Sequence, residues 1–311
     1  MKAGSLILDE FVLGAGNLGD PATKKECFEI TDTYLDMGYK TLDVARSYKD
    51  GACEEFLGEY LKGKDRGKIN IISKGGFPLS RKEMYKTRLS EKELRKDLEE
   101  SLKALNTDYI DLYFLHRDDV LFPPEEFIET ANKFVREGKV REIGASNWTA
   151  GRIGEANKYA LANGLKPFVA SEINFSLAVT TPALTGDITH IVMNDVEYDW
   201  YREENFPVIA YSVQAKGFFS KVFSKKPIKE SGRLSYPPLK ENYRRAERLK
   251  TLSEEKNVPI PALLISYVLS KDINSAAIGG FSTKAQLIES EQGAHIKLSN
   301  KEIEFLEKGT V

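Results

Sequence analysis

The sequence has few of the residues on which disulfide-rich and zinc-binding proteins depend. Its 311 residues include two cysteines, Cys27 and Cys53, and three histidines. Two cysteines exclude a scaffold held by several disulfides and a four-cysteine zinc site. Cys27 falls in an amphipathic stretch and is expected in the core. We therefore expect no metal site.

The sequence also lacks a large net charge and any long apolar run. The formal net charge is -2, so no broad attraction to nucleic acid is expected. No segment reaches the length of a membrane span, and no early apolar run follows a basic patch. Apolar residues make up 41% and charged residues 30%, which is ample for a large core. We expect a soluble, cytoplasmic protein that is a monomer or a weak homo-oligomer.

Short stretches rich in β-branched and aromatic residues recur along the chain, and helical patterns separate them. The clearest helix follows Ser90, which has the capping-box spacing with Glu93, and Ser299 with Glu302 repeats that signal. Eight such units in about 300 residues favour one (β/α)8 TIM barrel over residues 1–311. The expected strands are 11–16, 40–45, 69–74, 109–116, 140–146, 168–173, 207–212 and 275–280, and the other expected helices are 23–37, 52–62, 125–137, 149–163, 188–203, 241–256 and 261–271.

The longest irregular segment is 213–240, which is rich in lysine, serine and proline. It follows the seventh expected strand, so it belongs to the end of the barrel where barrel enzymes bind ligands. Its composition is compatible both with a mobile solvated loop and with a lid over a cofactor or substrate site.

A glycine-rich motif near the start imitates a dinucleotide-binding turn. Residues 14–19 read GAGNLG, and Asp43 ends the second expected strand, as the acidic residue of that fingerprint does. However, Asp20 and Pro21 follow Gly19, so the helix begins later than the fingerprint requires. Six further strand–helix units follow without a second domain. We interpret the motif as a tight turn at the barrel mouth whose backbone can line a pocket.

Four different titratable side chains fall at the ends of consecutive expected strands, where barrel enzymes carry their chemistry. Asp43 and Tyr48 follow the second strand, Lys74 ends the third and His116 ends the fourth. Each alone has an ordinary interpretation, as a loop acid, a surface tyrosine, a solvated lysine or a structural histidine. Together they are harder to explain without a function.

These four groups have a specific chemistry in common. A tyrosine phenol, with a reference pKa of about 10, is a poor proton donor at neutral pH. A neighbouring ammonium lowers that pKa, and an aspartate keeps the ammonium charged. Tyr48 is thus a candidate general acid tuned by Lys74 and Asp43, with a neutral His116 to orient a substrate oxygen. That oxygen would belong to a carbonyl that receives hydride from a cofactor, because no side chain supplies hydride.

The sequence resembles the aldo-keto reductase superfamily. The resemblance is carried by TLDVARSY, CEEFLGEYL, ISK, LYFLH and IGASNW, in that order, and extends over about residues 10–290. It implies a (β/α)8 barrel that interconverts carbonyls and alcohols with NAD(P)H. It also implies a catalytic set of Asp43, Tyr48, Lys74 and His116.

The same resemblance implies the cofactor contacts. Ser146 and Asn147 match the pair that holds the nicotinamide carboxamide, and Tyr211 matches the ring that stacks on the nicotinamide. The family usually has glutamine where this chain has Glu172, whose carboxylate accepts from an amide but cannot donate. The other expected cofactor contacts are Ser212, Gln214, Lys216, Gly217, Gly280, Ser282, Thr283, Lys284, Gln286 and Glu289.

The segment expected at the 2′-phosphate departs from the pattern of NADP-preferring relatives, which usually have an arginine or lysine there. Ser282, Thr283 and Gln286 occupy positions that are often basic, and Lys284 is the only cation nearby. A hydrogen bond to a charged group is worth roughly 1.5–3 kcal/mol, or about ten- to a hundredfold in affinity. We expect NADP(H), with NAD(H) as the alternative.

The expected function is hydride transfer from NAD(P)H to an aldehyde or ketone, a small-molecule substrate. The alternative is a cofactor-sensing regulatory or binding barrel with little turnover. Relatives that reduce carbon–carbon double bonds have glutamate in place of the catalytic histidine, so His116 favours carbonyl chemistry. The polar residues Arg117 and Asp118 allow two hypotheses. In one, the substrate is polar, such as a sugar; in the other, the two residues form a salt bridge that only orders the loop. The candidate substrate-binding residues are Asn17, Arg46, Arg117 and Trp148, with Asp118 and Phe218 as further pocket candidates.

Overall fold

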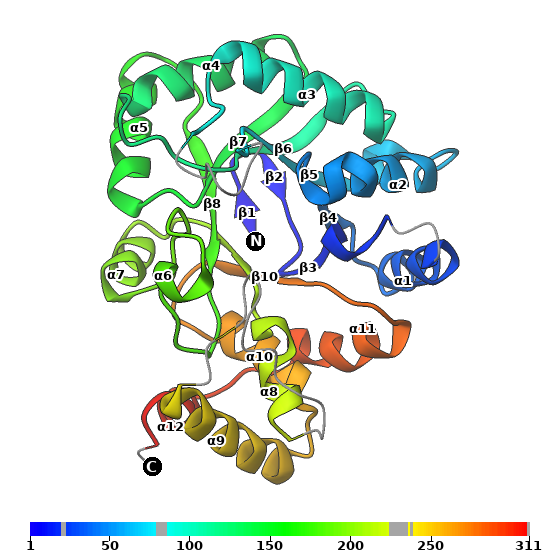
Figure 1. The fold of residues 1–311 in the computed structure, drawn as a ribbon, viewed down its shortest axis with the longest axis vertical. Helices are drawn as coiled ribbons and strands as arrows, with labels where there is room; N and C mark the ends of the chain where they lie inside the picture. The colour runs from blue at the N-terminus through cyan, green and yellow to red at the C-terminus, as the bar shows by residue number, and fades with distance from the viewer. Residues whose placement is uncertain (20–22, 79–85, 224–235, 237–238, 310–311) are drawn as a thin grey trace.

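The computed structural model describes residues 1–19, 23–78, 86–223, 236 and 239–309, and its centre is a closed barrel of parallel strands (Figure 1). The strands follow one another in chain order, and the last closes the barrel against the first. The predicted fold is confirmed. The barrel strands are β3 (Phe11–Gly14), β4 (Thr41–Asp43), β5 (Asn70–Gly75), β6 (Ile110–Leu115), β7 (Val140–Ser146), β8 (Phe168–Asn174), β9 (Val208–Tyr211) and β10 (Ser275–Gly279).

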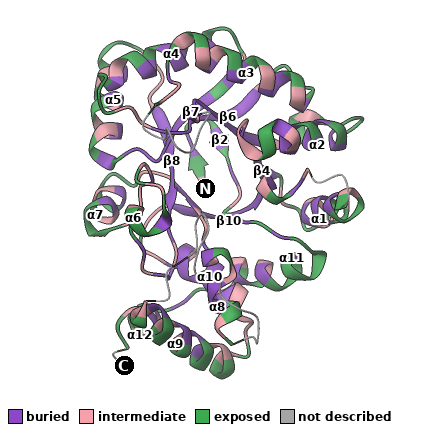
Figure 2. Ribbon diagram, viewed as in Figure 1, coloured by how far each residue is buried: buried purple, intermediate pink, exposed green. Residues whose placement is uncertain are grey.

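Helices surround the barrel, and buried and exposed residues alternate along them (Figure 2). In α3 (Glu91–Leu105), Ser90 caps the first turn by accepting from the backbone N–H of Glu93. One face of the helix is buried through Leu94, Leu98, Leu102 and Leu105. The other helices that follow the barrel strands are α1 (Lys24–Asp36), α2 (Ala52–Tyr60), α4 (Pro124–Arg136), α5 (Ala150–Ala162), α7 (Asp195–Glu203), α10 (Ile260–Leu269) and α11 (Lys284–Glu291).

Further helices elaborate the second half of the chain. They are α6 (Pro182–Thr185), α8 (Phe218–Val222), α9 (Lys240–Lys256) and α12 (Asn300–Lys308), and α12 begins with the complete capping box expected at Ser299 and Glu302. The expected helix 188–203 is shorter than predicted, because the side chain of Asn194 accepts from the backbone N–H groups of Val196 and Glu197 and starts α7 there. Residues 188–194 remain a loop.

A short hairpin that the sequence patterns did not predict packs at the centre of the ring of helices (Figure 1). It consists of β1 (Lys2–Ala3) and β2 (Leu6–Ile7), which pair antiparallel. Leu6 and Leu8 pack in one cluster with strand side chains that include Phe114 and Ile209. Ser5 donates from its backbone N–H and its hydroxyl to the buried Glu142 Oε1, at 2.9 and 2.5 Å. The hairpin thus supplies part of the barrel's core.

Half of the expected lid, 213–240, lies outside the described residues, which omit 224–235 and 237–238. Within it, α8 follows directly after a 3-10 turn at Ala215–Gly217. Tyr236 is buried, and its hydroxyl donates to Asn174 Oδ1 at the end of β8, 2.9 Å away. The lid itself remains a prediction.

Candidate active site

Lys74 is the centre of a buried polar cluster at the carboxyl ends of β4, β5 and β8. Its Nζ lies 2.6 Å from Asp43 Oδ2, 3.3 Å from Glu172 Oε1 and 3.3 Å from the Tyr48 hydroxyl. It also donates to the backbone carbonyl of Val44, 3.1 Å away. The ammonium is therefore held by a group from the adjacent strand β4 and by one from β8 across the barrel, and its position is fixed by the barrel itself.

The turn after β4 carries Tyr48 to the cluster. Tyr48 opens a 3-10 turn in which Lys49 and Asp50 adopt left-handed backbone angles, with φ of 48° and 55°. The tyrosine ring packs against Gly16 of the GAGNLG motif, where an added Cβ would lie 3.4 Å from ring atoms. The motif therefore forms a turn at the barrel mouth, beside the Tyr48 ring.

Burial and charge act against each other on the groups of the cluster. Burial raises the pKa of Tyr48 above its ordinary value, although Lys74 acts to lower it. The lysine alone would lower the pKa of Tyr48, as expected from the sequence, but burial outweighs it in the ligand-free protein. Burial acts to lower the pKa of Lys74, but Asp43 and Glu172 outweigh it and raise that pKa. Lys74 therefore stays charged.

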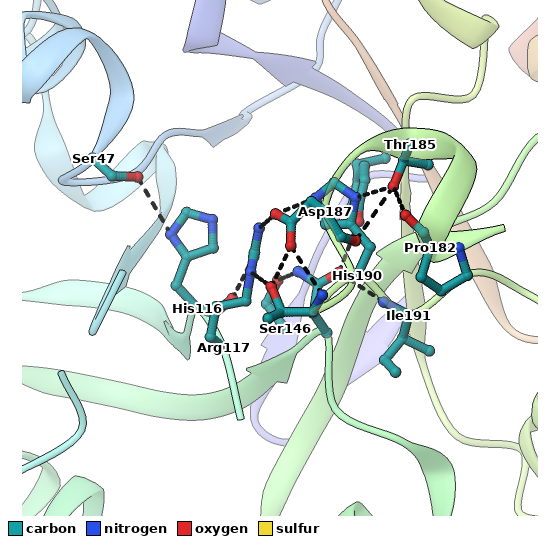
Figure 3. Close-up of polar contacts among 12 residues, drawn as sticks. Ser47, His116, Arg117, Ser146, Pro182, Thr185, Asp187, His190 and Ile191 are labelled. Carbon is teal, nitrogen blue, oxygen red and sulfur yellow. Dashed lines mark hydrogen bonds and ion pairs between the residues drawn. The ribbon is translucent and has the colours of Figure 1, made fainter. Parts of the chain in front are cut away.

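His116 ends β6 beside Tyr48. Its ring centroid lies 6.0 Å from that of Tyr48, edge to face, and its Nδ1 lies 3.5 Å from the Ser47 hydroxyl (Figure 3). Burial, together with the charges of Arg117 and Lys74, holds the pKa of His116 well below its usual range. The imidazole is neutral, so it can form a hydrogen bond with a substrate oxygen without adding a charge.

A cleft of about 460 Å³ opens over this cluster. Its lining combines the end of the β3 strand, the turn after β4, the ends of β5–β9 and the loop that precedes α7. The lining residues are Gly16, Asn17, Ser47, Tyr48, Lys49, Phe77, His116, Arg117, Ser146, Asn147, Glu172, Thr185, Gly186, Asp187, His190, Tyr211, Ser212 and Lys216.

One wall of the cleft is an ion-pair network around Arg117 (Figure 3). Arg117 Nη2 lies 3.0 Å from Asp187 Oδ2, and its Nε donates to Thr189 Oγ1. His190 Nε2 lies 3.2 Å from the same Asp187 oxygen. Sequence reasoning missed Asp187 and His190, because both lie in a loop that was expected to be helical or irregular. The Arg117–Asp118 pair considered above does not form, since Asp118 pairs with Arg152.

The residues expected at the nicotinamide lie beside this wall, where the ring centroids of His190 and Tyr211 are 5.9 Å apart. Tyr211 donates its hydroxyl to Asn147 Oδ1, 2.7 Å away, and Asn147 Nδ2 donates to Ser146 Oγ, 3.0 Å away. Asn147 and Ser212 both have left-handed backbone angles, with φ of 59° and 57°. Such backbone angles are strained for residues other than glycine, so the surrounding barrel must hold both residues in this conformation. Glu172 and Lys216 line the same cleft.

The expected adenosine-phosphate segment lies at the end of β10 and the start of α11. Gly280 approaches Asn17, whose side-chain nitrogen would lie 3.3 Å from an added Cβ. Thr283 caps α11, and Gln286 Oε1 accepts from the backbone N–H of Ser282. Lys284 Nζ lies 3.9 Å from Glu29, a distant surface pair. Two other expected cofactor contacts are Glu289, which lies in α11, and Gly217, which directly precedes α8.

The structure corrects the expected positions of several side chains. Arg46 bonds to Glu100 and lies against Gly51, away from the cleft. Trp148 is fully buried and donates its indole N–H to the backbone carbonyl of Arg117. Neither residue lines the cleft, so neither is placed to touch a substrate, and Phe218 is buried as well. Gln214 is half-buried, and its side chain donates to Ser290 Oγ and to the carbonyl of Pro261.

Within the described residues, no group of three or more histidine, cysteine, aspartate or glutamate side chains is arranged to hold a metal ion. No helix in the same part of the chain is both long and apolar enough to cross a membrane.

A (β/α)8 barrel with a buried Asp–Tyr–Lys cluster and a neutral histidine at its strand ends is the architecture of a class of oxidoreductases. The chain belongs to the aldo/keto reductase family, whose sequence model matches residues 10–309. It is 27% identical over 305 residues to an aryl-alcohol dehydrogenase of Pestalotiopsis microspora, covering 94% of this chain and 74% of that protein. It is 27% identical over 285 residues to norsolorinic acid reductase of Aspergillus flavus, covering 89% and 69%.

Solved structures share the fold. A thermostable aldo-keto reductase in complex with the inhibitor epalrestat superimposes with a TM-score of 0.77 at 23% identity, covering 99% of this chain and 98% of that one. An aldo/keto reductase from Klebsiella pneumoniae, in complex with NADP and acetate, has a TM-score of 0.71 at 22% identity, covering 97% and 91%.

Proposed function

We propose that this protein is an NADP(H)-dependent carbonyl reductase in which Tyr48 protonates the oxygen of an aldehyde or ketone. The observation that carries the proposal is the contact between the Tyr48 hydroxyl and the buried Lys74 ammonium, 3.3 Å apart, in a cleft that His116 also lines. Membership of the aldo/keto reductase family supports the reaction class. The similarity to an aryl-alcohol dehydrogenase and a norsolorinic acid reductase supports a carbonyl or alcohol substrate.

The donor set of the cleft fits a nicotinamide cofactor. Ser146 and Asn147 offer a hydroxyl and an amide to a carboxamide, and the Tyr211 ring offers an aromatic face. Lys216 lines the cleft and forms no ion pair with the described residues, as suits a cation that meets a phosphate. When bound, the cofactor supplies the hydride. The NADP in the Klebsiella pneumoniae relative supports the same cofactor here.

The side chains of the cluster handle the proton that accompanies the hydride. As the carbonyl carbon gains hydride, its oxygen takes the proton of the Tyr48 hydroxyl, and an alcohol and a phenolate result. Lys74 stabilises the phenolate by its charge, and Asp43 holds Lys74 in place at 2.6 Å. The neutral His116 orients the carbonyl oxygen by a hydrogen bond. In the reverse direction the phenolate accepts the alcohol proton.

The direct test is to titrate the purified protein separately with NADPH and NADH, following tryptophan fluorescence and calorimetry. Trp148 donates to the backbone of Arg117, which lines the cleft, so its emission should respond to binding. Saturable binding, followed by turnover on a panel of aldehydes and ketones, supports the proposal. Binding without turnover on any carbonyl would favour the cofactor-sensing alternative, and no binding would contradict both.

Replacing Lys284 tests the choice between the two cofactors. Lys284→Ala should weaken NADPH binding by about ten- to a hundredfold, because it removes a charged hydrogen bond to the 2′-phosphate. NADH, which lacks that phosphate, should bind with an unchanged dissociation constant. The surface pair of Lys284 with Glu29, at 3.9 Å, is too weak for its loss to affect folding noticeably.

The matched control is Lys301→Ala on α12, which removes an exposed lysine from another helix. Its NADPH and NADH dissociation constants should equal those of the parent protein. If Lys284→Ala leaves the NADPH/NADH ratio unchanged, the start of α11 does not meet the 2′-phosphate.

A further inference from the structure

The buried cluster contains one more carboxyl group than it has cations. Lys74 lies between Asp43, at 2.6 Å, and Glu172, at 3.3 Å. The exposed fractions of these side chains are 0% for Lys74 and 3% for each carboxyl. If both acids were ionised, the cluster would hold an uncompensated negative charge out of water, which is costly.

The groups that surround Glu172 do not supply the missing positive charge. From the turn after β4 and from β9 it faces Tyr48 and Tyr211, whose pKa values burial raises, so both are neutral. His116 on β6 is neutral for the reason given above. Of the other cations that line the cleft, Arg117 is paired with Asp187 at 3.0 Å, and Lys49 and Lys216 are exposed to solvent. The other cleft residues beside it, Ser146 and Asn147 on β7, carry no charge.

The missing charge is therefore a proton. Both carboxyl groups approach the same ammonium, Lys74 Nζ, whose single charge can neutralise only one of them. Glu172 Oε2 accepts no hydrogen bond from an N–H or O–H of the described residues, so nothing there holds it as a carboxylate. Burial and the neighbouring Asp43 raise the pKa of Glu172 to about 8, whereas Asp43 lies closer to Lys74.

Glu172 also lines the cleft beside the residues proposed to hold the nicotinamide. The oxidised nicotinamide ring carries a positive charge and the reduced ring is neutral, so an ionised carboxylate at this point favours the oxidised form. Resting on the proposed function, we infer that Glu172 keeps a proton in the ligand-free protein and releases it to solvent when oxidised cofactor binds. Glu172 thus makes the preference between oxidised and reduced cofactor depend on pH.

Proton release on binding tests this inference directly. Calorimetric titrations with NADP⁺ and with NADPH, each at pH 7 in buffers of different ionisation enthalpy, give the number of protons exchanged. The wild-type protein should release close to one proton per NADP⁺ bound and close to none per NADPH. As pH rises toward the pKa of Glu172, the NADP⁺ dissociation constant should fall by up to about tenfold per pH unit. The NADPH dissociation constant should not change over the same range.

Glu172→Gln should bind NADP⁺ without releasing a proton and with a pH-independent dissociation constant. The matched control is Glu142→Gln, which changes another buried glutamate of the barrel, on β7 against the amino-terminal hairpin, and should leave proton release unchanged. Binding of NADP⁺ by the wild type without proton release would overturn this inference alone. Failure of both cofactors to bind would overturn the proposed function together with it.

The retained proton can also be detected without cofactor, from thermal unfolding between about pH 5 and pH 8. Because the folded pKa of Glu172, about 8, exceeds its unfolded value of 4.5, the native state binds more protons in this window and loses stability as pH rises. Relative to wild type, Glu172→Gln should gain several °C in Tm by about pH 8 and little at about pH 5. A Tm difference that does not change with pH would show that Glu172 holds no proton. If Glu172→Gln does not fold, proton release by the wild type still decides.

Discussion

Tyr48→Phe should lower kcat/KM for every carbonyl substrate by about 10²–10⁴-fold, which is the usual contribution of a positioned general acid. The substitution removes only the hydroxyl oxygen, so the carbonyl oxygen loses its proton donor while the ring can still pack on Gly16. Lys74 keeps its closer partners, Asp43 at 2.6 Å and the carbonyl of Val44 at 3.1 Å. The dissociation constant for NADPH should therefore change by less than about threefold. Steady-state kinetics and calorimetry on the same preparation measure both quantities.

Tyr159→Phe is the matched control, because it removes a hydroxyl that bonds only to Glu129 on the surface. It should keep the full kcat/KM of the parent protein. If Tyr48→Phe and Tyr159→Phe turn over at comparable rates, Tyr48 is not the acid and the proton comes from another donor. A large loss of NADPH affinity in Tyr48→Phe would instead assign the tyrosine a binding role.

Lys74→Met should be the most destabilising of the substitutions considered, because it removes the single cation of a fully buried cluster. Breaking a buried ion pair from one side costs about 3–5 kcal/mol of unfolding free energy, since the partner is left without its counter-charge. Here Asp43 loses its counter-charge, and Glu172 loses the ammonium that lies 3.3 Å from its Oε1. Methionine fills a similar volume, so the loss reports on charge more than on packing.

The loss of unfolding free energy in Lys74→Met should grow as pH rises. Without the ammonium, the folded-state pKa values of both acids rise further, so the native state takes up protons that the unfolded chain releases above about pH 4–5. Denaturant unfolding should therefore show a small deficit near pH 5 and a large one near pH 8. Lys250→Met, on the exposed face of α9, should show no deficit at either pH. An equal deficit for Lys74→Met at both pH values would mean that lost packing, not unpaired charge, explains it.

The sequence located the barrel strands because each is a short, buried, β-branched run whose character does not depend on distant partners. It did not locate the amino-terminal hairpin, because strands of two residues carry no periodic signal and Leu6 and Leu8 gain their partners only when the barrel closes. It placed the start of α7 too early, since Asn194 caps the helix inside a run that otherwise resembles one.

The candidate site was predictable where one side chain follows one strand. Asp43, Lys74 and His116 come together because parallel strands end at one face of a barrel, which spacing alone shows. The Asp187–Arg117–His190 wall was not predictable, because it depends on how a long loop folds back over β6. Trp148 was expected to contact substrate, but only its neighbour Asn147 lines the cleft. The Trp148 side chain is buried and donates to the backbone carbonyl of Arg117.

The amino-terminal hairpin has a consequence for how the chain reaches its native state. Leu6 and Leu8 precede every barrel strand in the chain, yet the residues that cover them extend from Ile72 in β5 to Ile209 in β9. Contacts this distant in sequence form late, since a long loop must close before they stabilise anything. We therefore expect the hairpin to dock in the same step that seals the barrel. Until then its leucines are exposed, and the chain is most prone to associate with other copies during that interval.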